Sequence, residues 1–127
     1  MNDKCSIYLN QVNRQTFYFL GSSHTNHHRH THYLLNTNKN VNVVSFTLSF
    51  CSLFDRTSQC GGIDGPQSRI YNEVLDKVKE NDVVVISHRF NIKKGKKTFW
   101  LDDQREFNLF KSFYKIIKDR NAKLIII

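Results

Sequence analysis

Long apolar runs are missing from this sequence. None approaches the roughly 18–20 consecutive apolar residues that a membrane-spanning helix needs. Polar residues recur throughout the first 20 positions, so we expect no secretory signal peptide on this chain. Delivery by a preceding membrane segment of a longer protein remains compatible with both absences.

Proline and closely spaced cysteines are also scarce. Pro66 is the single proline, and the three cysteines are Cys5, Cys51 and Cys60. No C-x-x-C spacing occurs, which excludes the common zinc and dithiol redox motifs. Cys51 and Cys60 flank a short polar loop. They can close it as a disulfide in an oxidising compartment or remain thiols in a reducing one, and the residues leave both open.

Negative charge is in short supply. The chain has nineteen Lys and Arg and eleven Asp and Glu, which gives a net charge of +8. Such a balance suits nucleic acid, anionic headgroups or phosphate. However, Lys93, Lys94, Lys96 and Lys97 crowd one Gly-containing loop, and no recognised nucleic-acid motif occurs. We therefore expect a solvated basic surface and no nucleic-acid partner.

Strand-like and helix-like patterns alternate along the chain. Val83 to Ile86 is apolar without alternation, which predicts a strand covered on both faces, as in a parallel sheet. The alternation predicts an α/β fold with helices on both faces of a parallel sheet, and the length suits one domain, 1–127. The expected strands are 16–20, 41–50, 83–86 and 123–127, and the expected helices are 24–35, 69–80 and 104–120.

Smaller features complete this outline. Residues 5–9 can form a short edge segment, and two long loops are expected at 51–68 and 87–103. Asn36 and Asn38 are expected to end the first helix. Asp103, with Glu106 three residues later, predicts a capped start for the last helix.

The chain is organised around Thr16 to His24, a short β-prone strand followed by a small-residue turn. Ser23 sits where this turn meets the next helix. A hydroxyl would then be exposed at the carboxyl end of a strand, where open α/β sheets place their ligands. Backbone N–H groups at a helix start favour negative charge. The stretch therefore predicts a serine-nucleophile site.

These residues resemble a known family. Phe19-Leu20-Gly21-Ser22-Ser23-His24 is similar to the first block of the SGNH/GDSL hydrolases, Gly-Asp-Ser after a hydrophobic strand. The following His resembles the Gly-Asp-Ser-His variant of SGNH domains attached to acyltransferase family 3 membrane proteins, which O-acylate cell-surface glycans. Residues 81–90 are similar to that branch's Asp-Val-Val-hydrophobic-Ser-x-Arg-Trp stretch, and Cys5 and the loop from Cys51 to Cys60 also match it.

The resemblance implies a three-layer sandwich with a flavodoxin-like parallel sheet, the SGNH hydrolase fold, incomplete at the C-terminus. It covers the front of that domain, and the sequence ends inside an apolar strand, so we expect a C-terminally truncated copy or, alternatively, part of a longer protein. It also favours a Cys51–Cys60 disulfide and an extracytoplasmic location, at the periplasmic or cell-surface face of the membrane. An N-terminal membrane acyltransferase domain is an expected partner.

The resemblance also assigns roles. Ser23 takes the place of the nucleophile, and its backbone N–H that of an oxyanion-hole donor. Gly61 or Gly62 matches the family's second donor. Many members have an Asn after the third strand as a third donor, where this chain has Ser87-His88-Arg89 with Asn91 beyond. Supporting roles are expected for Ser22, His24, Arg89 and Asn91, and no cofactor is implied.

Two departures weaken the catalytic prediction. Ser22 replaces the usual Asp, and the family's Asp-x-x-His, the base and its orienting group, occurs nowhere in the 127 residues. Because a serine without an adjacent base is a weak nucleophile, we expect this chain alone to be nearly inactive. His24, His27 or His88 can be weighed as a substitute base. The alternative is that His24 packs beside the turn as a neutral imidazole.

The expected function is therefore a serine esterase or O-acyltransferase domain for acylated cell-surface polysaccharide or lipid-linked glycan. Its partners would be the acylated glycan or an acyl donor. One alternative is a non-catalytic glycan- or phosphate-binding domain. Another is a metal site, because His24, His28 and His32 fall on one helical stripe, although no Glu accompanies them as a His-Glu-x-x-His motif requires.

Overall fold

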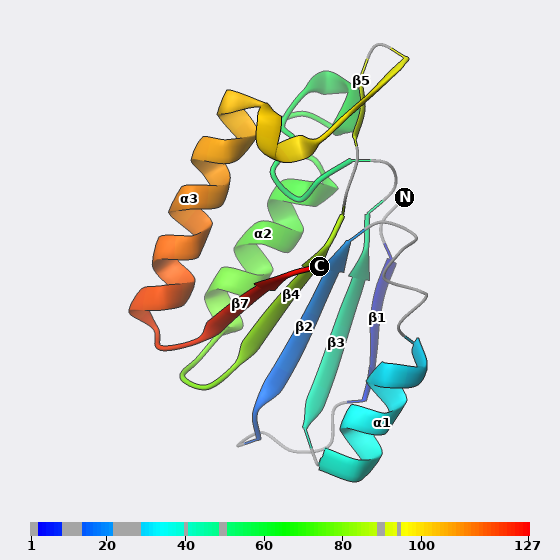
Figure 1. Cartoon of the computed structure of the whole chain (residues 1–127), viewed down its shortest axis with the longest axis vertical. Helices are drawn as coiled ribbons and strands as arrows, with labels where there is room; N and C mark the ends of the chain where they lie inside the picture. Colours follow the sequence, from blue (N-terminus) through cyan, green and yellow to red (C-terminus); the bar gives the residue numbers. More distant parts are fainter. Residues whose placement is uncertain are drawn as a thin grey trace.

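The computed structural model describes residues 3–8, 14–21, 29–39, 41–48, 51–88, 91–93 and 95–127. Its centre is a five-stranded sheet in the order β1-β3-β2-β4-β7 (Figure 1). Four strands run parallel, as predicted, while β1 pairs antiparallel with β3 at one edge. The strands are β1 (Asp3–Tyr8), β2 (Thr16–Gly21), β3 (Asn42–Thr47), β4 (Val83–Ser87) and β7 (Lys123–Ile126).

Helices pack on both faces of this sheet. Alternate residues of each strand point to opposite faces, and they belong to two separate core clusters. Leu20, Val84 and Ile86 pack with residues of α2 (Pro66–Lys77) and α3 (Gln104–Asp119). Phe19 and Val85 pack on the other face with Leu35 of α1 (Arg29–Lys39). The three-layer α/β arrangement is therefore confirmed, and no helix among the described residues is long and apolar enough to cross a membrane.

The first of the two long loops contributes to the core. Phe54 is 1 % exposed, and its ring centroid lies 5.2 Å from that of Trp100 and 5.6 Å from that of Phe113. This loop also contains a short 3-10 turn, η2 (Ser58–Cys60). The segment after β3 is thus packed against α3 rather than lying free on the surface.

The prediction of a long loop over 87–103 missed the regular structure in this segment. This segment contains a hairpin of β5 (Asn91–Lys93) and β6 (Lys96–Thr98), followed by a second 3-10 turn, η3 (Trp100–Asp102). Gly95 lies in the hairpin turn with φ +75°, a left-handed conformation that glycine adopts without strain. Lys96 and Lys97 are exposed, as expected for a solvated basic surface.

Several predicted boundaries are also wrong. α2 begins at Pro66 rather than Arg69, because proline fits the first helical position, where its missing N–H is not needed. It ends at Lys77 rather than Glu80. α1 continues to Lys39 and is not stopped by Asn36, whose side-chain amide donates instead to the Val41 carbonyl at 2.9 Å. β3 ends at Thr47, whereas a strand to residue 50 was predicted.

The start of α3 follows the prediction. Asp103 Oδ1 accepts the backbone N–H groups of Arg105 and Glu106 at 2.9 and 3.1 Å. This is the N-cap interaction that satisfies otherwise unpaired donors at a helix start. The helix then packs Phe113 and Ile117 fully buried against the sheet.

Asp82 joins elements at the amino ends of the strands. Its carboxylate is fully buried and accepts the N–H of Thr16 at 2.9 Å and that of Lys79 at 2.9 Å. The Lys79 ammonium pairs with it at 2.8 Å. The carboxylate therefore joins the start of β2 to the turn before β4. Both lie at the amino ends of the strands, whereas the predicted site is at the carboxyl ends.

Candidate functional site

β2 ends at the centre of the sheet's carboxyl edge. Its last residue, Gly21, is in register with Thr47 of β3 on one side and Ser87 of β4 on the other. The chain leaves β2 through α1 to reach β3, and leaves β4 through α3 to reach β7, so the two connections run in opposite directions (Figure 1). The gap between β2 and β4 is therefore a topological switch point, where open α/β sheets bind ligands.

The predicted nucleophile directly follows this position. Gly21 is described, and its carbonyl accepts the N–H of Leu48 at 2.6 Å. Residues 22–28 lie outside the described residues, and with them Ser22, Ser23, His24 and the histidines at 27 and 28. The structure thus positions the strand that leads to Ser23, and the role of Ser23 stays a prediction.

Across the switch point, β4 leads to His88. Its side chain is buried, and its backbone carbonyl accepts a hydrogen bond from the indole N–H of Trp100. Because Ser87 is in register with Gly21, His88 lies one residue beyond the strand pair that flanks the switch point. Arg89 lies outside the described residues, and Asn91 opens β5, where its backbone is in register with Thr98.

The loop after β3 is closed by a disulfide between Cys51 and Cys60, with Cα atoms 5.9 Å apart. This is the pairing that the resemblance favours. Both cysteines are buried, and the turn that follows places Gly61 and Gly62 at φ +92° and +72°. Non-glycine residues rarely adopt such values, so glycine is needed here for the shape of the backbone.

The two predicted glycine donors are already hydrogen-bonded. Gly61 N–H donates to the Ser58 carbonyl at 3.3 Å, and Gly62 N–H donates to the Thr57 carbonyl at 2.8 Å. A bond of 3.3 Å is longer than the usual N–H···O range, so the Gly61 N–H is the more easily redirected of the two. The sequence left both glycines open, and these distances favour Gly61.

Gly65 packs its backbone against Gly61. A Cβ built on Gly65 would lie 2.7 Å from the carbonyl carbon and oxygen of Gly61, closer than any side chain tolerates. Gly65 is also the N-cap of α2, and its N–H donates to the Gly62 carbonyl at 3.2 Å. The start of α2 therefore fixes the position of the Gly61 peptide.

Ser52 and Glu106 form a contact that the sequence did not predict. Both are buried, and the Ser52 hydroxyl donates to Glu106 Oε1 while its oxygen accepts the N–H of Phe54 at 3.2 Å. Glu106 was predicted to serve the helix start alone. Its carboxylate also anchors the loop after β3 to α3, across 54 residues of sequence.

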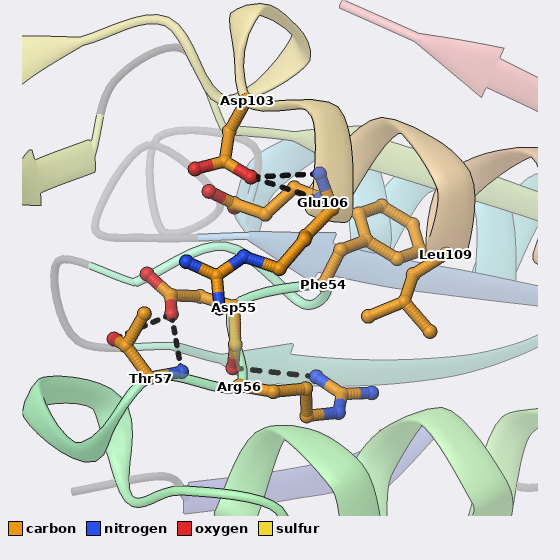
Figure 2. A pocket seen from close by; sticks show the side chains of 8 residues that line it. Phe54, Asp55, Arg56, Thr57, Asp103, Glu106 and Leu109 are labelled. Atoms are coloured by element: carbon orange, nitrogen blue, oxygen red, sulfur yellow. Dashed lines mark hydrogen bonds between the residues drawn. The ribbon is translucent and has the colours of Figure 1, made fainter.

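A small hollow, partly open to solvent, lies between this loop and the start of α3 (Figure 2). Asp55 lines this hollow, and its Oδ1 accepts hydrogen bonds from the N–H and the hydroxyl of Thr57 at 2.8 and 2.7 Å. An Asp two residues before a backbone donor is a common turn pattern that the sequence could have revealed. The lining residues are Phe54, Asp55, Arg56, Thr57, Asp103, Arg105, Glu106 and Leu109.

Arg56 lies beside this hollow with its guanidinium carbon 5.3 Å from the centre of the Tyr71 ring. It donates to the Leu53 carbonyl. Burial lowers the pKa of the Arg56 guanidinium below its ordinary value. Burial also raises the pKa of the Tyr71 hydroxyl, although the charge of Arg56 opposes that shift. The cation is thus held against an aromatic face, a stabilising arrangement.

Of the three histidines on the predicted stripe, only His32 lies among the described residues. His32 is 4 % exposed, and its ring centroid lies 4.0 Å from that of Phe19 in the layer between α1 and the sheet. His24 and His28 lie outside the described residues. Among the residues that the structure describes, the group with ligand atoms close enough for a metal ion is Cys51, Asp55 and Cys60.

The arrangement brings the end of β2, the end of β4 and the glycine turn to the carboxyl side of one sheet (Figure 1). It shows where an α/β protein with this strand order would bind a ligand. No protein-family model matches the chain, and no curated protein matches its sequence significantly.

Proposed function

We propose that this chain belongs to an SGNH-type serine esterase or O-acyltransferase domain that acts on acylated cell-surface polysaccharide or lipid-linked glycan. The observation that carries the proposal is the end of β2 at the switch point, with Ser23 two residues beyond Gly21. The parallel strands follow the order β3-β2-β4-β7, which corresponds to the flavodoxin-like order 2-1-3-4.

The chemistry would be acyl transfer. The Ser23 hydroxyl loses its proton to a base and attacks an ester carbonyl, which forms a tetrahedral oxyanion. Collapse gives an acyl-serine and releases the alcohol, which takes a proton from the base. Water then yields the free acid, or a sugar hydroxyl yields an O-acylated glycan.

Stabilisation of the oxyanion would fall to backbone N–H groups. Ser23 supplies one, and Gly61 supplies a second when its long bond to the Ser58 carbonyl is exchanged for one to the oxyanion. Loss of one such donor typically costs about 3–4 kcal/mol of transition-state stabilisation.

The base is the missing component. No Asp-x-x-His occurs in the 127 residues, and His88 is the described histidine that follows a strand end beside the switch point. The proposed enzyme therefore acts efficiently only in a form that carries an Asp-x-x-His. The Cys51–Cys60 disulfide supports an oxidising, extracytoplasmic setting, where a membrane acyltransferase domain could supply the acyl donor.

The test is hydrolysis of an activated acetyl ester by a form of the protein that carries an Asp-x-x-His. Ser23→Ala should reduce the rate to that of the uncatalysed reaction and leave the circular dichroism spectrum unchanged. Ser112→Ala is the matched control, because it removes an exposed hydroxyl on α3 and should keep the activity. Undiminished turnover by Ser23→Ala overturns the proposal.

A second candidate is a non-catalytic glycan- or phosphate-binding domain. The bonds that occupy the Gly61 and Gly62 N–H groups favour it, since a binding module needs no free oxyanion donors. The net charge of +8 suits a phosphate ligand. Saturable binding of an O-acetylated glycan or phosphate, with no ester hydrolysis in any form of the protein, would establish this function.

A further inference from the structure

The disulfide has a third polar neighbour. Asp55 offers a carboxylate oxygen that lies within 4.8 Å of both sulfur atoms of Cys51 and Cys60, which themselves lie within that distance of each other. All three side chains are buried, Asp55 completely. Once the disulfide is reduced, two cysteine sulfurs and a carboxylate form a donor set of a kind that zinc sites use.

Asp55 is already held in a fixed orientation. The N–H and hydroxyl of Thr57 both donate to its Oδ1, at 2.8 and 2.7 Å. Hydrogen bonds of this kind orient carboxylate ligands in metal sites and are needed for full affinity. Arg56 donates to the Leu53 carbonyl and lies over the Tyr71 ring, and its charge also interacts with that of Asp55.

One member of the cluster borders a hollow that is partly open to solvent. Asp55 lines the hollow between the loop and α3 (Figure 2). Cys51 and Cys60 do not line this hollow, so a metal ion that enters from it would meet Asp55 first. A buried site needs such an entry path if it is to exchange metal.

We propose that Cys51, Asp55 and Cys60 bind a divalent metal of borderline softness, Zn²⁺ above all, when the disulfide is reduced. Zinc is usually four-coordinate with sulfur, nitrogen and oxygen ligands, and a site with three protein ligands keeps its fourth position for water. Thiolates also select zinc over magnesium or calcium. The loop after β3 then has two closed forms, one held by the disulfide and one held by the metal.

A thiol or phosphine reductant converts the disulfide-closed loop into the form that binds metal. Two electrons from the reductant break the S–S bond and leave the two thiols of Cys51 and Cys60. Binding of Zn²⁺ displaces their two protons to solvent. Two Zn–S bonds of about 2.3 Å at a tetrahedral angle place the sulfurs about 3.8 Å apart. Rotation of the side chains supplies this separation, since the Cα atoms are 5.9 Å apart.

The experiment is a Co²⁺ titration of the Cys5→Ser protein, which leaves only the paired cysteines. After reduction by a phosphine, one equivalent of Co²⁺ should produce a thiolate-to-cobalt charge-transfer band, and Zn²⁺ should abolish the band by displacement. The oxidised protein should show no band. Histidine sites cannot imitate this signal because it requires thiolate ligands.

Two matched variants test the role of the carboxylate. Asp55→Asn should weaken Co²⁺ binding at least tenfold, about the smallest loss that follows removal of even an outer partner in a metal site. Asp64→Asn removes an exposed carboxylate from the same loop and should leave the affinity unchanged. Equal effects of the two variants overturn the assignment of Asp55. A charge-transfer band that persists unchanged in Cys51→Ser overturns the assignment of Cys51.

Reduction by itself can loosen the fold, and this outcome is also decisive. If the metal-free reduced protein loses helical signal, Co²⁺ or Zn²⁺ should restore it and raise the unfolding temperature with metal concentration. A reduced protein that shows neither a charge-transfer band nor any recovery with metal overturns the proposal. So does a folded reduced protein that shows no band.

Discussion

The contact between Gly65 and Gly61 gives the sharpest test of the loop geometry. Gly65 has φ −72° and ψ 177°, a conformation open to any residue, so the backbone itself does not require glycine. The limited space at this position does require glycine, because a Cβ would lie 2.7 Å from the Gly61 carbonyl. Gly65→Ala must therefore displace a peptide, and overpacking of this kind costs about 1–3 kcal/mol of unfolding free energy.

Gly62→Ala is the matched comparison in the same turn. A Cβ at Gly62 meets nothing within 4 Å, but its φ of +72° is unfavourable for alanine. The left-handed conformation costs roughly 1–2 kcal/mol. The two variants are thus destabilised for different reasons, one by contact and one by conformation.

Asparagine separates the two causes. It tolerates left-handed φ values, so Gly62→Asn should recover most of the stability that Gly62→Ala loses. Gly65→Asn should not recover it, although asparagine is a preferred N-cap, because its Cβ meets the same carbonyl. Urea unfolding with the disulfide intact measures all four variants. Wild-type stability of Gly65→Ala, or recovery by asparagine at both positions, would refute the reasoning.

Two further predictions concern Tyr18 and Asp82. Burial, with a smaller contribution from the charge of Asp82, raises the pKa of Tyr18 to about 12 from an ordinary 10.0. The unfolded chain therefore ionises first, and the stability that is complete below pH 10 should fall by roughly 2–3 kcal/mol as the pH rises to about 12. Tyr18→Phe should flatten this decline in urea unfolding measured against pH, and an unchanged slope would contradict the shift. Asp82→Ala leaves the buried N–H of Thr16 and the part-buried N–H of Lys79 without their acceptor and should cost roughly 2–5 kcal/mol. Lys79→Ala should cost under about 1 kcal/mol because the Lys79 side chain is 45 % exposed; equal losses would show that the backbone bonds to Asp82 contribute little.

The parallel part of the fold could be predicted because its signals are local. Val83 to Ile86 is apolar at every position, and both of its faces are buried under helices. Asp103 also carried its own signal for a helix start. The hairpin of β5 and β6 carried none, since lysine-rich strands of three residues lack an apolar alternation.

The site could be predicted as far as its backbone frame. The hydrophobic strand and small-residue turn located the end of β2, which the structure places at the sheet centre. The bond between Ser52 and Glu106 could not be predicted, because residues 54 apart meet only after α3 packs against the loop. The hydrogen bonds that the Gly61 and Gly62 N–H groups donate could not be predicted either, because they depend on the fold of η2.

The last strand has a consequence for handling the protein. In the described part of the chain, β7 pairs with β4 on one side and stands at the edge of the sheet on the other. Ile125, Ile126 and Ile127 are 43 to 45 % exposed, and Lys123 is the one charged residue of the strand. An apolar edge strand is a template for pairing with other molecules and for aggregation. The unfolding experiments should therefore be run at several protein concentrations, because self-association through β7 would change the apparent stability without any change inside the monomer.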